Sequence, residues 1–449
     1  MSDTTRQKLL MIAYFFPPAG AVGVYRTLKF AKYLPEFGWA PCILTTSNGR
    51  FPTYDASLAR LIPDGVPVHR CAGFELLNEG LRRPAAGPRR KTLWSRVHTR
   101  LYLAWNWVAL PDTRIGWVPS AFFAAWRIVR REHIEHVYIS GSPFSSFLIG
   151  AMLKGFARVR VTIDYRDPWT QNINYARRTA LHRRLDRALE RWVVGRSDVV
   201  ISNTRFNDGR MFSEFGDGGD REKFVAIHNG FDADDFAAIA REATDKFTIT
   251  YAGAFYYSIG SNFQGGAGDD VMKTYSPLYF FEALQQFFAR RPDAKERTRV
   301  RFMGVLGQGY DPVIRERGLE SVVERLGYID YDAHLRVLRN SDALLLVLSR
   351  GEKSRGWIPS KFFQYLGTGN PILALAPEGE VRDIIRETRG GLVVEPDDAA
   401  AASRAVEELY DSWASGTSIA HQDPDAVARF ERRNLTERLA RALQPRKMV

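Results

Sequence analysis

Short apolar runs, rich in β-branched and aromatic residues, alternate with segments of helical periodicity along the whole chain. This alternation limits the possible folds more than any other feature. In the first half, the candidate strands are residues 8–14, 40–45, 136–140, 159–165, 198–203 and 223–228. In the second half, they are residues 247–252, 300–305, 322–328, 342–348, 371–376 and 391–394. Strands separated by helices favour an α/β fold with parallel, doubly wound sheets.

The pattern restarts in the second half, and two halves of about 200 residues predict two Rossmann-like domains that face a central cleft. A turn-rich stretch at residues 228–247, after the Asn-Gly dipeptide, marks the junction. We place the N-terminal domain at residues 1–235 and the C-terminal domain at residues 236–420. Residues 421–449 are expected to form a C-terminal helix that returns toward the N-terminal domain, with its amphipathic part at residues 425–443.

The composition excludes several classes of protein. Only two cysteines, Cys42 and Cys71, occur in 449 residues, which excludes a disulfide scaffold and C-x-x-C zinc sites and fits a reducing compartment. No apolar run approaches the ~20 residues that span a bilayer. The run at residues 9–16 ends in Phe-Phe-Pro-Pro without a cleavage site, so it predicts a buried strand rather than a secretion signal. We expect a cytoplasmic protein, free or on a membrane surface.

Positive charge is concentrated in one segment, residues 82–131. It holds eleven Lys or Arg residues against a single acid, Asp112, and five of the ten tryptophans, including Trp105 and Trp107. Indoles and basic side chains together suit an anionic membrane surface. A solvated basic face over core tryptophans and a nucleic-acid surface are the alternatives, of which nucleic acid is the least favoured. A second basic helix is expected at residues 177–196.

A glycine-bearing turn follows the first strand. Gly20 and Gly23 precede a helix, and the free N–H groups of a helix start can bind an anion where no Cβ blocks the approach. A tight turn without a ligand explains the glycines equally well. On the next helix, Arg26, Lys29 and Lys32 share one face, which predicts a basic surface for a phosphate or headgroup unless it is merely solvated.

Polar residues close the strand at residues 159–165. Asp164, Arg166 and Asp167 lie beside Trp169, just past the carboxyl end of a parallel strand, where ligands of α/β proteins bind. Buried acids beside an arginine need pairing or a polar ligand. The segment is therefore a structural ion pair, or else Asp167 orients an acceptor hydroxyl.

The densest candidate segment is residues 355–375. Pro359 and Ser360 open a helix whose first turn holds Lys361, a cation that opposes the helix dipole unless an anion binds there. Gln364 lies one turn later on nearly the same face and can hydrogen-bond a ribose. The helix ends at Gly367 and Gly369, before a buried strand.

These motifs resemble those of the retaining glycosyltransferases of family 4, which have the GT-B fold. Residues 359–375 are similar to the family's donor-site run P-x-K-x-x-E-Y-L-x-x-G-x-P-I-L-A-L. Residues 15–26 resemble its first loop, residues 166–169 its acceptor-side R-D-x-W turn, residues 227–232 its N-G-x-D sequence and residues 251–253 its donor-domain opening strand. The resemblance spans nearly the full length, in the family's order.

The resemblance implies transfer of a sugar from a nucleoside-diphosphate sugar to an acceptor hydroxyl, with retention of configuration and without a metal or other cofactor. The first domain would bind the acceptor and the second the donor. The implied catalytic residues are Asp167 and Lys361. The implied donor-binding residues are Gly20, Gly23, Asn229, Gly356, Ser360, Lys361, Gln364 and Tyr365, and those on the acceptor or membrane side are Arg26, Arg166, Trp105 and Trp107.

The sequence departs from the family at the donor site. Gln364 replaces the second of two glutamates that lie eight residues apart, and Gly356 stands at the position of the first. A Gly-rich insert at residues 257–275, with Lys273 as a possible phosphate cation, follows the opening strand and predicts a lid over the donor. A catalytically silent GT-B module that binds a nucleotide sugar or a partner protein, and a GT-B nucleotide-sugar epimerase, are the alternative functions.

The expected partners follow from the charge and the resemblance. They are a nucleotide-sugar donor, a lipid-linked or glycan acceptor and an anionic membrane surface, with no nucleic acid. We therefore expect a peripheral enzyme on the inner face of the cell membrane that acts in bacterial surface-polysaccharide assembly.

Overall fold

The chain divides into two compact units in a computed structural model. The structure describes residues 6–20, 23–51, 53–74, 100–101, 104–172, 179–216, 219–242, 245–255, 275–417, 419 and 421–445. Unit 1 comprises Met1–His228 with Arg432–Val449, and unit 2 comprises Asn229–Glu431. The boundaries expected from sequence were residues 235 and 420, whereas the units meet seven residues before the first of these and eleven after the second.

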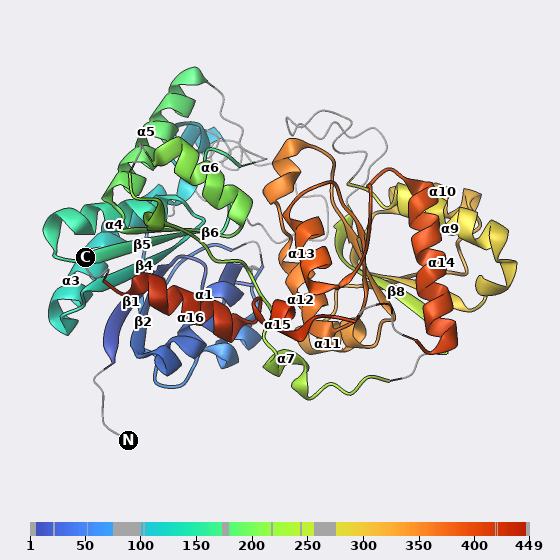
Figure 1. The fold of residues 1–449 in the computed structure, drawn as a ribbon. Helices are drawn as coiled ribbons and strands as arrows, with labels where there is room; N and C mark the ends of the chain where they lie inside the picture. The colour runs from blue at the N-terminus through green and yellow to red at the C-terminus, as the bar shows by residue number, and fades with distance from the viewer. Residues whose placement is uncertain are drawn as a thin grey trace. The chain divides into compact units, whose positions relative to one another are not determined.

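Unit 1 is built on a parallel sheet of seven strands in the order β3-β2-β1-β4-β5-β6-β7 (Figure 1). The strands are β1 (Gln7–Ala13), β2 (Trp39–Thr46), β3 (Val68–Cys71), β4 (His136–Gly141), β5 (Arg160–Tyr165), β6 (Val199–Ser202) and β7 (Phe224–Ala226). The order reverses between β1 and β4, and in such sheets ligands bind outside the carboxyl ends at that switch point. The loops after β1, β4 and β5 are therefore placed for ligand binding.

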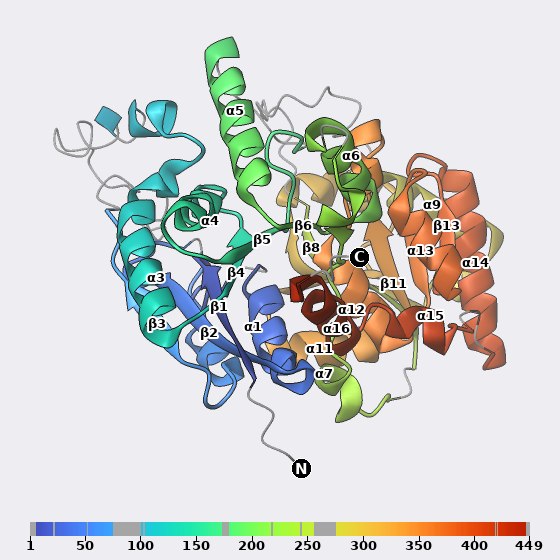
Figure 2. The ribbon, with the colours of Figure 1, turned by 60° about the vertical axis from the view of Figure 1, so that its left-hand side comes forward.

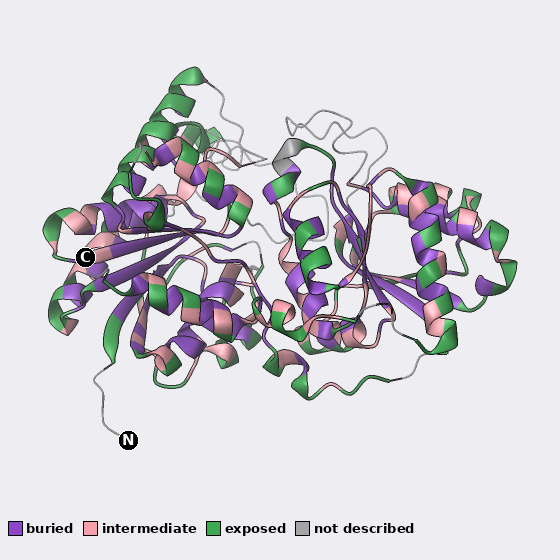
Figure 3. Ribbon diagram, viewed as in Figure 1, coloured by how far each residue is buried: buried purple, intermediate pink, exposed green. Residues whose placement is uncertain are grey.

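The helices of unit 1 connect these strands. They are α1 (Gly23–Tyr33), α3 (Val118–Glu132), α4 (Ser145–Phe156), α5 (Ala180–Arg196), α6 (Arg205–Phe215) and α16 (Arg432–Leu443). α3, α4 and α5 pack in sequence, and α1 packs on α16. Figure 2 shows α5 extending away from the body of unit 1, and Figure 3 shows that much of this helix is exposed.

Unit 2 repeats the architecture with six parallel strands in the order β10-β9-β8-β11-β12-β13. The strands are β8 (Phe247–Phe255), β9 (Thr298–Leu306), β10 (Val323–Gly327), β11 (Ala343–Val347), β12 (Ile372–Leu375) and β13 (Gly391–Val394). Alternate residues of β11 join two separate core clusters, Leu345 and Val347 one of them and Leu344 and Leu346 the other. The sheet is thus buried on both faces, as a doubly wound fold requires.

The helices of unit 2 are α7 (Asp234–Ala237), α9 (Leu278–Arg290), α10 (Asp311–Glu316), α11 (Tyr331–Arg339), α12 (Ser360–Thr368), α13 (Glu380–Thr388), α14 (Ala399–Ser415) and α15 (Pro424–Ala428). The single 3₁₀ turn that matters for the site is η7 (Glu352–Gly356). Within the described part of the chain, no helix is both long and apolar enough to cross a membrane.

The prediction of a single helix at residues 425–443 is wrong. It is two helices, α15 in unit 2 and α16 in unit 1, because the chain leaves helical geometry at Phe430 and Glu431. Phe430 is buried in unit 2 and its carbonyl accepts a hydrogen bond from the N–H of Phe231, 3.1 Å away. Leu435 and Leu439 of α16 are buried in the core of unit 1. The two halves of the apolar stripe therefore serve different cores.

Candidate functional site

The start of α12 lies at the switch point of the unit 2 sheet. α12 follows β11, and β11 is paired with β8. Pro359, in extended conformation, precedes the first residue, Ser360, and has no polar side chain to cap the helix. The Phe362 N–H donates to the Pro359 carbonyl at 3.0 Å, so the N–H groups of Ser360 and Lys361 are the ones placed for a ligand, at the position where α/β sheets bind one.

Lys361 lies over the end of β8. Its Nζ is 3.7 Å from the centre of the Tyr251 ring. A Cβ on Gly253, which has a φ of +140°, would come within 3.1 Å of the same Nζ. The glycine of this tyrosine-x-glycine sequence therefore leaves the space that lets the ammonium reach the strand end.

The charge of Lys361 is not balanced by any acidic group of the described residues. Among the described residues, no carboxylate forms an ion pair with it, and burial lowers the pKa of Lys361 to about 7. The positive end of the α12 dipole adds to this cost. A cation in such a place is explained by an anionic ligand that neutralises both, and a diphosphate is one.

Gln364 contacts a histidine that sequence reasoning did not single out. Its Oε1 lies 3.4 Å from Nε2 of His334 on α11. Burial lowers the pKa of His334, although the contact with Gln364 raises it. His334 also stacks on Tyr331, with ring centres 6.4 Å apart and planes 6° apart. The neutral amide is thus held by a side chain 30 residues earlier, which no local pattern indicates.

Tyr365, which the family motif places at the donor site, has its hydroxyl bonded within the protein. Its ring is fully buried in the unit 2 core, and its hydroxyl accepts a hydrogen bond of 2.8 Å from the N–H of Ala252. Because Ala252 separates Tyr251 from Gly253, Tyr365 fixes the strand end beneath Lys361. Gly356 is buried at the end of η7, and Asn229 is the half-buried first residue of unit 2.

In unit 1, the first-loop glycines have protein partners. The Gly20 N–H donates to the carbonyl of Thr53, 2.9 Å away, so it is not free for a phosphate. A Cβ on Gly23, the first residue of α1, would lie only 1.0 Å from Nη1 of Arg166. Gly23 is therefore required by the guanidinium that packs against the helix start.

Arg166 is held at the switch point of unit 1. Its Nε donates to the Gly141 carbonyl at 2.7 Å and its Nη2 to the Ser142 carbonyl at 2.6 Å, just past β4. Nη1 is left against the start of α1. The next residue, Asp167, is exposed, so its carboxylate projects from a turn whose arginine is anchored.

Arg26 is not part of a basic surface, and that expectation is wrong. It is 1% exposed, and its Nε and Nη2 donate to the two carboxylate oxygens of Asp164 at 2.6 and 3.0 Å. Its remaining N–H groups bind the carbonyls of Ile227 and His228. The structural ion pair that the sequence left open thus exists, but it joins Asp164 to Arg26.

Of the predicted basic, tryptophan-rich segment at residues 82–131, the structure describes residues 100–101 and 104–131. Its other residues lie outside the described part of the chain. Trp107 is 44% exposed, whereas Trp105 is half-buried and donates to the Thr113 carbonyl at 3.2 Å. Trp117 is fully buried. Asp112 binds the N–H and hydroxyl of Ser145, at the start of α4. Trp107 is therefore the exposed indole of the part described.

Trp107 adjoins the second basic helix. His182, near the start of α5, places Nε2 2.9 Å from the Trp107 carbonyl, and the two rings are 4.7 Å apart. The exposed face of α5 carries five arginines and three large apolar side chains. These are Arg183, Arg184, Arg187, Arg191 and Arg196, with Leu181, Leu185 and Trp192. Both acids of α5, Asp186 and Glu190, are buried, and Glu214 of α6 pairs with Arg187, so the other four arginines give the outward face its positive charge.

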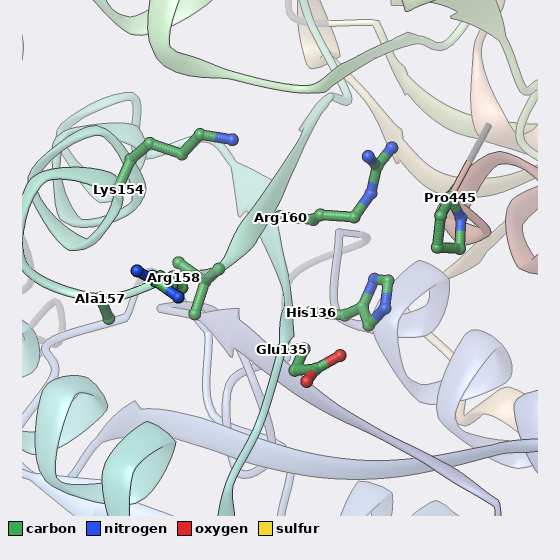
Figure 4. A pocket seen from close by; sticks show the side chains of 8 residues that line it. Glu135, His136, Lys154, Ala157, Arg158, Arg160 and Pro445 are labelled. Carbon is green, nitrogen blue, oxygen red and sulfur yellow. The ribbon is translucent and has the colours of Figure 1, made fainter. Parts of the chain in front are cut away.

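A cavity of about 400 Å³ lies at the opposite edge of the unit 1 sheet (Figure 4). It is lined by Glu135, His136, Lys154, Ala157, Arg158, Val159, Arg160 and Pro445. His136 and Arg160 are the first residues of β4 and β5. The cavity is thus at the amino ends of the strands, away from Arg166 and Gly23. Lys273 and the expected lid lie outside the described residues, and within those residues no three His, Cys, Asp or Glu side chains are grouped to hold a metal.

Family comparisons match both units. The family described as Glycosyltransferase Family 4 matches residues 24–235, and the family described as Glycosyl transferases group 1 matches residues 274–412. Together they account for well over half of the chain. A comparison with curated proteins finds no match.

Solved structures share the fold across nearly the whole chain. Alr3699/HepE from Anabaena, in complex with UDP and glucose, is similar with a TM-score of 0.57 and 14% identity, covering 98% of this chain and 99% of that one. Sucrose-phosphate synthase from Thermosynechococcus elongatus has a TM-score of 0.58 and 14% identity, over 97% and 98% of the two chains. A putative UDP-N-acetylglucosamine 2-epimerase from Listeria monocytogenes has a TM-score of 0.54 and 12% identity, over 97% and 95%.

Proposed function

Since the chain belongs to the GT-B glycosyltransferases of family 4, we propose that it transfers a sugar from a nucleoside-diphosphate sugar to an acceptor hydroxyl with retention of configuration. The observation that carries this proposal is the ammonium of Lys361 at the open start of α12, without an acidic partner among the described residues. The proposed ligand there is the donor diphosphate. The complex of Alr3699/HepE with UDP and glucose supports a donor of this class.

The proposed chemistry requires stabilisation of a departing diphosphate. As the bond between the sugar and the phosphate breaks, charge grows on the phosphate oxygen while the sugar becomes oxocarbenium-like. Positive groups fixed in advance stabilise that charge without reorganising, and such preorganisation is commonly the largest contribution to the rate. Lys361 and the first N–H groups of α12 would do this, and retention would follow if the departing phosphate accepts the acceptor's proton on the same face.

No metal is needed in this proposal. In many phosphate-binding enzymes a divalent cation neutralises the diphosphate, but here Lys361 and the α12 dipole would supply the positive charge. We therefore propose that activity persists in the presence of a chelator. Asp167, exposed beside the anchored Arg166, is the proposed partner of the acceptor hydroxyl.

The donor site of unit 2 is tested by two linked measurements. A thermal-shift screen with UDP-, GDP-, ADP- and dTDP-sugars identifies the donor class, and nucleoside-diphosphate release with an acceptor then measures turnover. Lys361→Ala should lower turnover ~10²-fold or more. The matched control is Lys8→Ala, because Lys8 is 52% exposed at the amino end of β1 and pairs with Glu132. Unchanged turnover in Lys361→Ala removes that residue from the site.

The same assay separates the enzyme from a catalytically silent module. Gln364, which offers one carbonyl acceptor where the family has a carboxylate, is the feature that favours the silent alternative. Binding of a nucleotide sugar without release above background supports that alternative. The anomeric configuration of the product, read by NMR coupling constants, tests retention.

We further propose a peripheral location at the inner face of the cell membrane, with a lipid-linked or glycan acceptor in polysaccharide assembly. The support is the face of α5, where five arginines surround Leu181, Leu185 and Trp192, next to Trp107. Arginines near an anionic leaflet contribute about 1 kcal/mol each, and tryptophan favours the headgroup level.

Vesicle co-sedimentation tests this location. Binding to vesicles with anionic lipid should be strong at low salt and lost at high salt. Changing Arg183, Arg184 and Arg196 together to Gln should weaken binding about 100-fold, from about 1 kcal/mol for each charge. The control carries the same three changes on unit 2, at Arg290, Arg315 and Arg404. Equal binding by both variants contradicts the assignment of the surface to α5.

A further inference from the structure

We propose that Glu190, on the inner face of α5, is a positioning residue that holds the turn at residues 166–169 in the shape that presents Asp167. This inference rests on the proposed function, because it assigns a role to the acceptor-side turn. The turn lies between β5 and α5, and a single carboxyl group contacts the residues on both sides of it.

The contacts to Glu190 begin just after the turn. Oε2 of Glu190 accepts hydrogen bonds from both the N–H of Thr170, at 3.2 Å, and the Thr170 hydroxyl. Thr170 directly follows Trp169, the last residue of the turn. The Glu190 carboxyl therefore fixes the backbone and the side chain of the residue at which the turn ends.

The other contact lies just before the turn. Tyr165, the last residue of β5, is fully buried, and its pKa is raised by burial and further by the charge of Glu190 beside it. Within the described part of the chain, neither this hydroxyl nor Oε1 of Glu190 has a partner that meets both the distance and the angle of a hydrogen bond. The carboxyl of Glu190 thus acts on Tyr165 as well as on Thr170.

Other contacts hold the turn at its base and at Trp169, whose carbonyl accepts a hydrogen bond of 3.3 Å from the Asn172 N–H. Trp169 stacks on Phe144, with ring centres 5.4 Å apart and planes 6° apart, and its buried indole N–H has no hydrogen-bond acceptor among the residues that the structure describes. Asn203 donates to the Arg166 carbonyl at 2.5 Å. These contacts anchor the base of the turn, whereas Thr170 is held by Glu190.

Burying a carboxyl group costs desolvation free energy, so it is an unfavourable choice for a helix contact. Glu190 is 0% exposed, and an apolar side chain of similar size would avoid its desolvation. Polar groups that break the rules of core packing are commonly retained at functional sites. Besides burial, the like charge of Asp186 on the same helix raises the pKa of Glu190, so this neighbouring charge does not favour a carboxylate there.

The test compares variants that keep or remove the oxygen acceptor. Glu190→Gln keeps a carbonyl oxygen for Thr170, whereas Glu190→Leu removes it. Thr170→Val removes the hydroxyl from the other side of the contact with almost no change of volume. Glu214→Gln is the matched control, since it changes a glutamate on the neighbouring helix α6. Each variant is studied as the full chain, by steady-state kinetics and by hydrogen exchange over residues 165–172.

We expect Glu190→Leu and Thr170→Val to lower kcat about tenfold, because a displacement of the turn by a fraction of an ångström misaligns the acceptor. The donor KM should change less than about twofold, since the donor contacts lie in unit 2. Hydrogen exchange at residues 165–172 should accelerate in both variants. Glu190→Gln should restore kcat, and Glu214→Gln should behave as the unmodified chain.

Two outcomes overturn the inference. If exchange accelerates in Glu190→Leu and Thr170→Val but kcat is unchanged, Glu190 has only a structural role. If exchange is unchanged in both, the turn is not held by this contact. Exchange does not depend on activity, so if no nucleotide sugar is turned over even by the unmodified chain, the proposed function fails and exchange alone still decides whether Glu190 holds the turn.

Discussion

Binding of a nucleoside diphosphate should become weaker with rising pH because of one side chain, Lys361. Lowering its pKa from 10.5 to about 7 means that burial favours the neutral amine by about 5 kcal/mol. The Tyr251 ring face, 3.7 Å from Nζ, returns about 1 kcal/mol to the charged form. The free protein should therefore lose this charge between pH 7 and pH 8.

The sign follows from linkage. A bound diphosphate raises the pKa of Lys361, since it stabilises the ammonium, so binding takes up a proton wherever the free amine is neutral. The dissociation constant should be nearly constant below pH 7 and should rise up to about tenfold for each further pH unit. The phosphate groups do not confuse this range, because their last ionisation lies near pH 6.

Isothermal titration calorimetry in buffers of different ionisation enthalpy measures the proton count directly. We expect an uptake approaching one proton at pH 8.5 for the unmodified chain and for Lys8→Ala. Lys361→Met, which keeps the length of the side chain without its charge, should bind more weakly, with no proton uptake. An unchanged uptake in Lys361→Met, or a dissociation constant that is constant from pH 7 to pH 9, refutes the reasoning.

Three further predictions concern Gly23, Tyr365 and Glu190, whose contacts only the structure shows. Gly23→Ala should displace the Arg166 guanidinium, because the new Cβ would lie 1.0 Å from its Nη1. Steady-state kinetics should show turnover lowered about tenfold. Urea unfolding should show a free energy of unfolding changed by less than about 1 kcal/mol. Tyr365→Phe should lower the free energy of unfolding by about 1–3 kcal/mol, since the buried Ala252 N–H loses its acceptor, and unchanged stability in urea would contradict this role. Burial raises the pKa of Glu190 from 4.5 to about 7. The contribution of Glu190 to stability is therefore full below pH 4.5 and is lost as the pH rises through 7. In urea titrations, Glu190→Gln should have a free energy of unfolding up to about 3 kcal/mol higher than the unmodified chain at pH 8, with little difference at pH 5.

The strands were predictable because their signal is local. Every predicted apolar run is a strand of one of the two sheets, and no end is displaced by more than three residues. The strand that sequence reasoning missed is β3, whose four residues Val68–Cys71 are polar or half-buried at the sheet edge. An edge strand with little apolar surface has no periodic signal to detect.

The site was predictable where a backbone feature creates it. The proline before Ser360 and the cation in the first turn are neighbours in the sequence, so the helix start and Lys361 could be predicted from it. His334 could not be found, because it reaches the helix from another element, and neither could the contact of Lys361 with Tyr251, although residues 251–253 match a family motif. The tyrosine after Gln364 matched the family motif, yet its hydroxyl binds the backbone of β8 instead of a ligand.

The sequence by itself determined the periodic order of strands and helices, the Rossmann-like character of both units and the helix start that carries Lys361. Only the tertiary structure decided which charges are available. Arg26 pairs with Asp164, 138 residues away in the sequence, and this pair neutralises its charge. The Arg166 guanidinium occupies the space that Gly23 leaves. The physical reason is that periodicity depends on residues a few positions apart, whereas the availability of a charge depends on every group that the fold brings within a few ångströms of it.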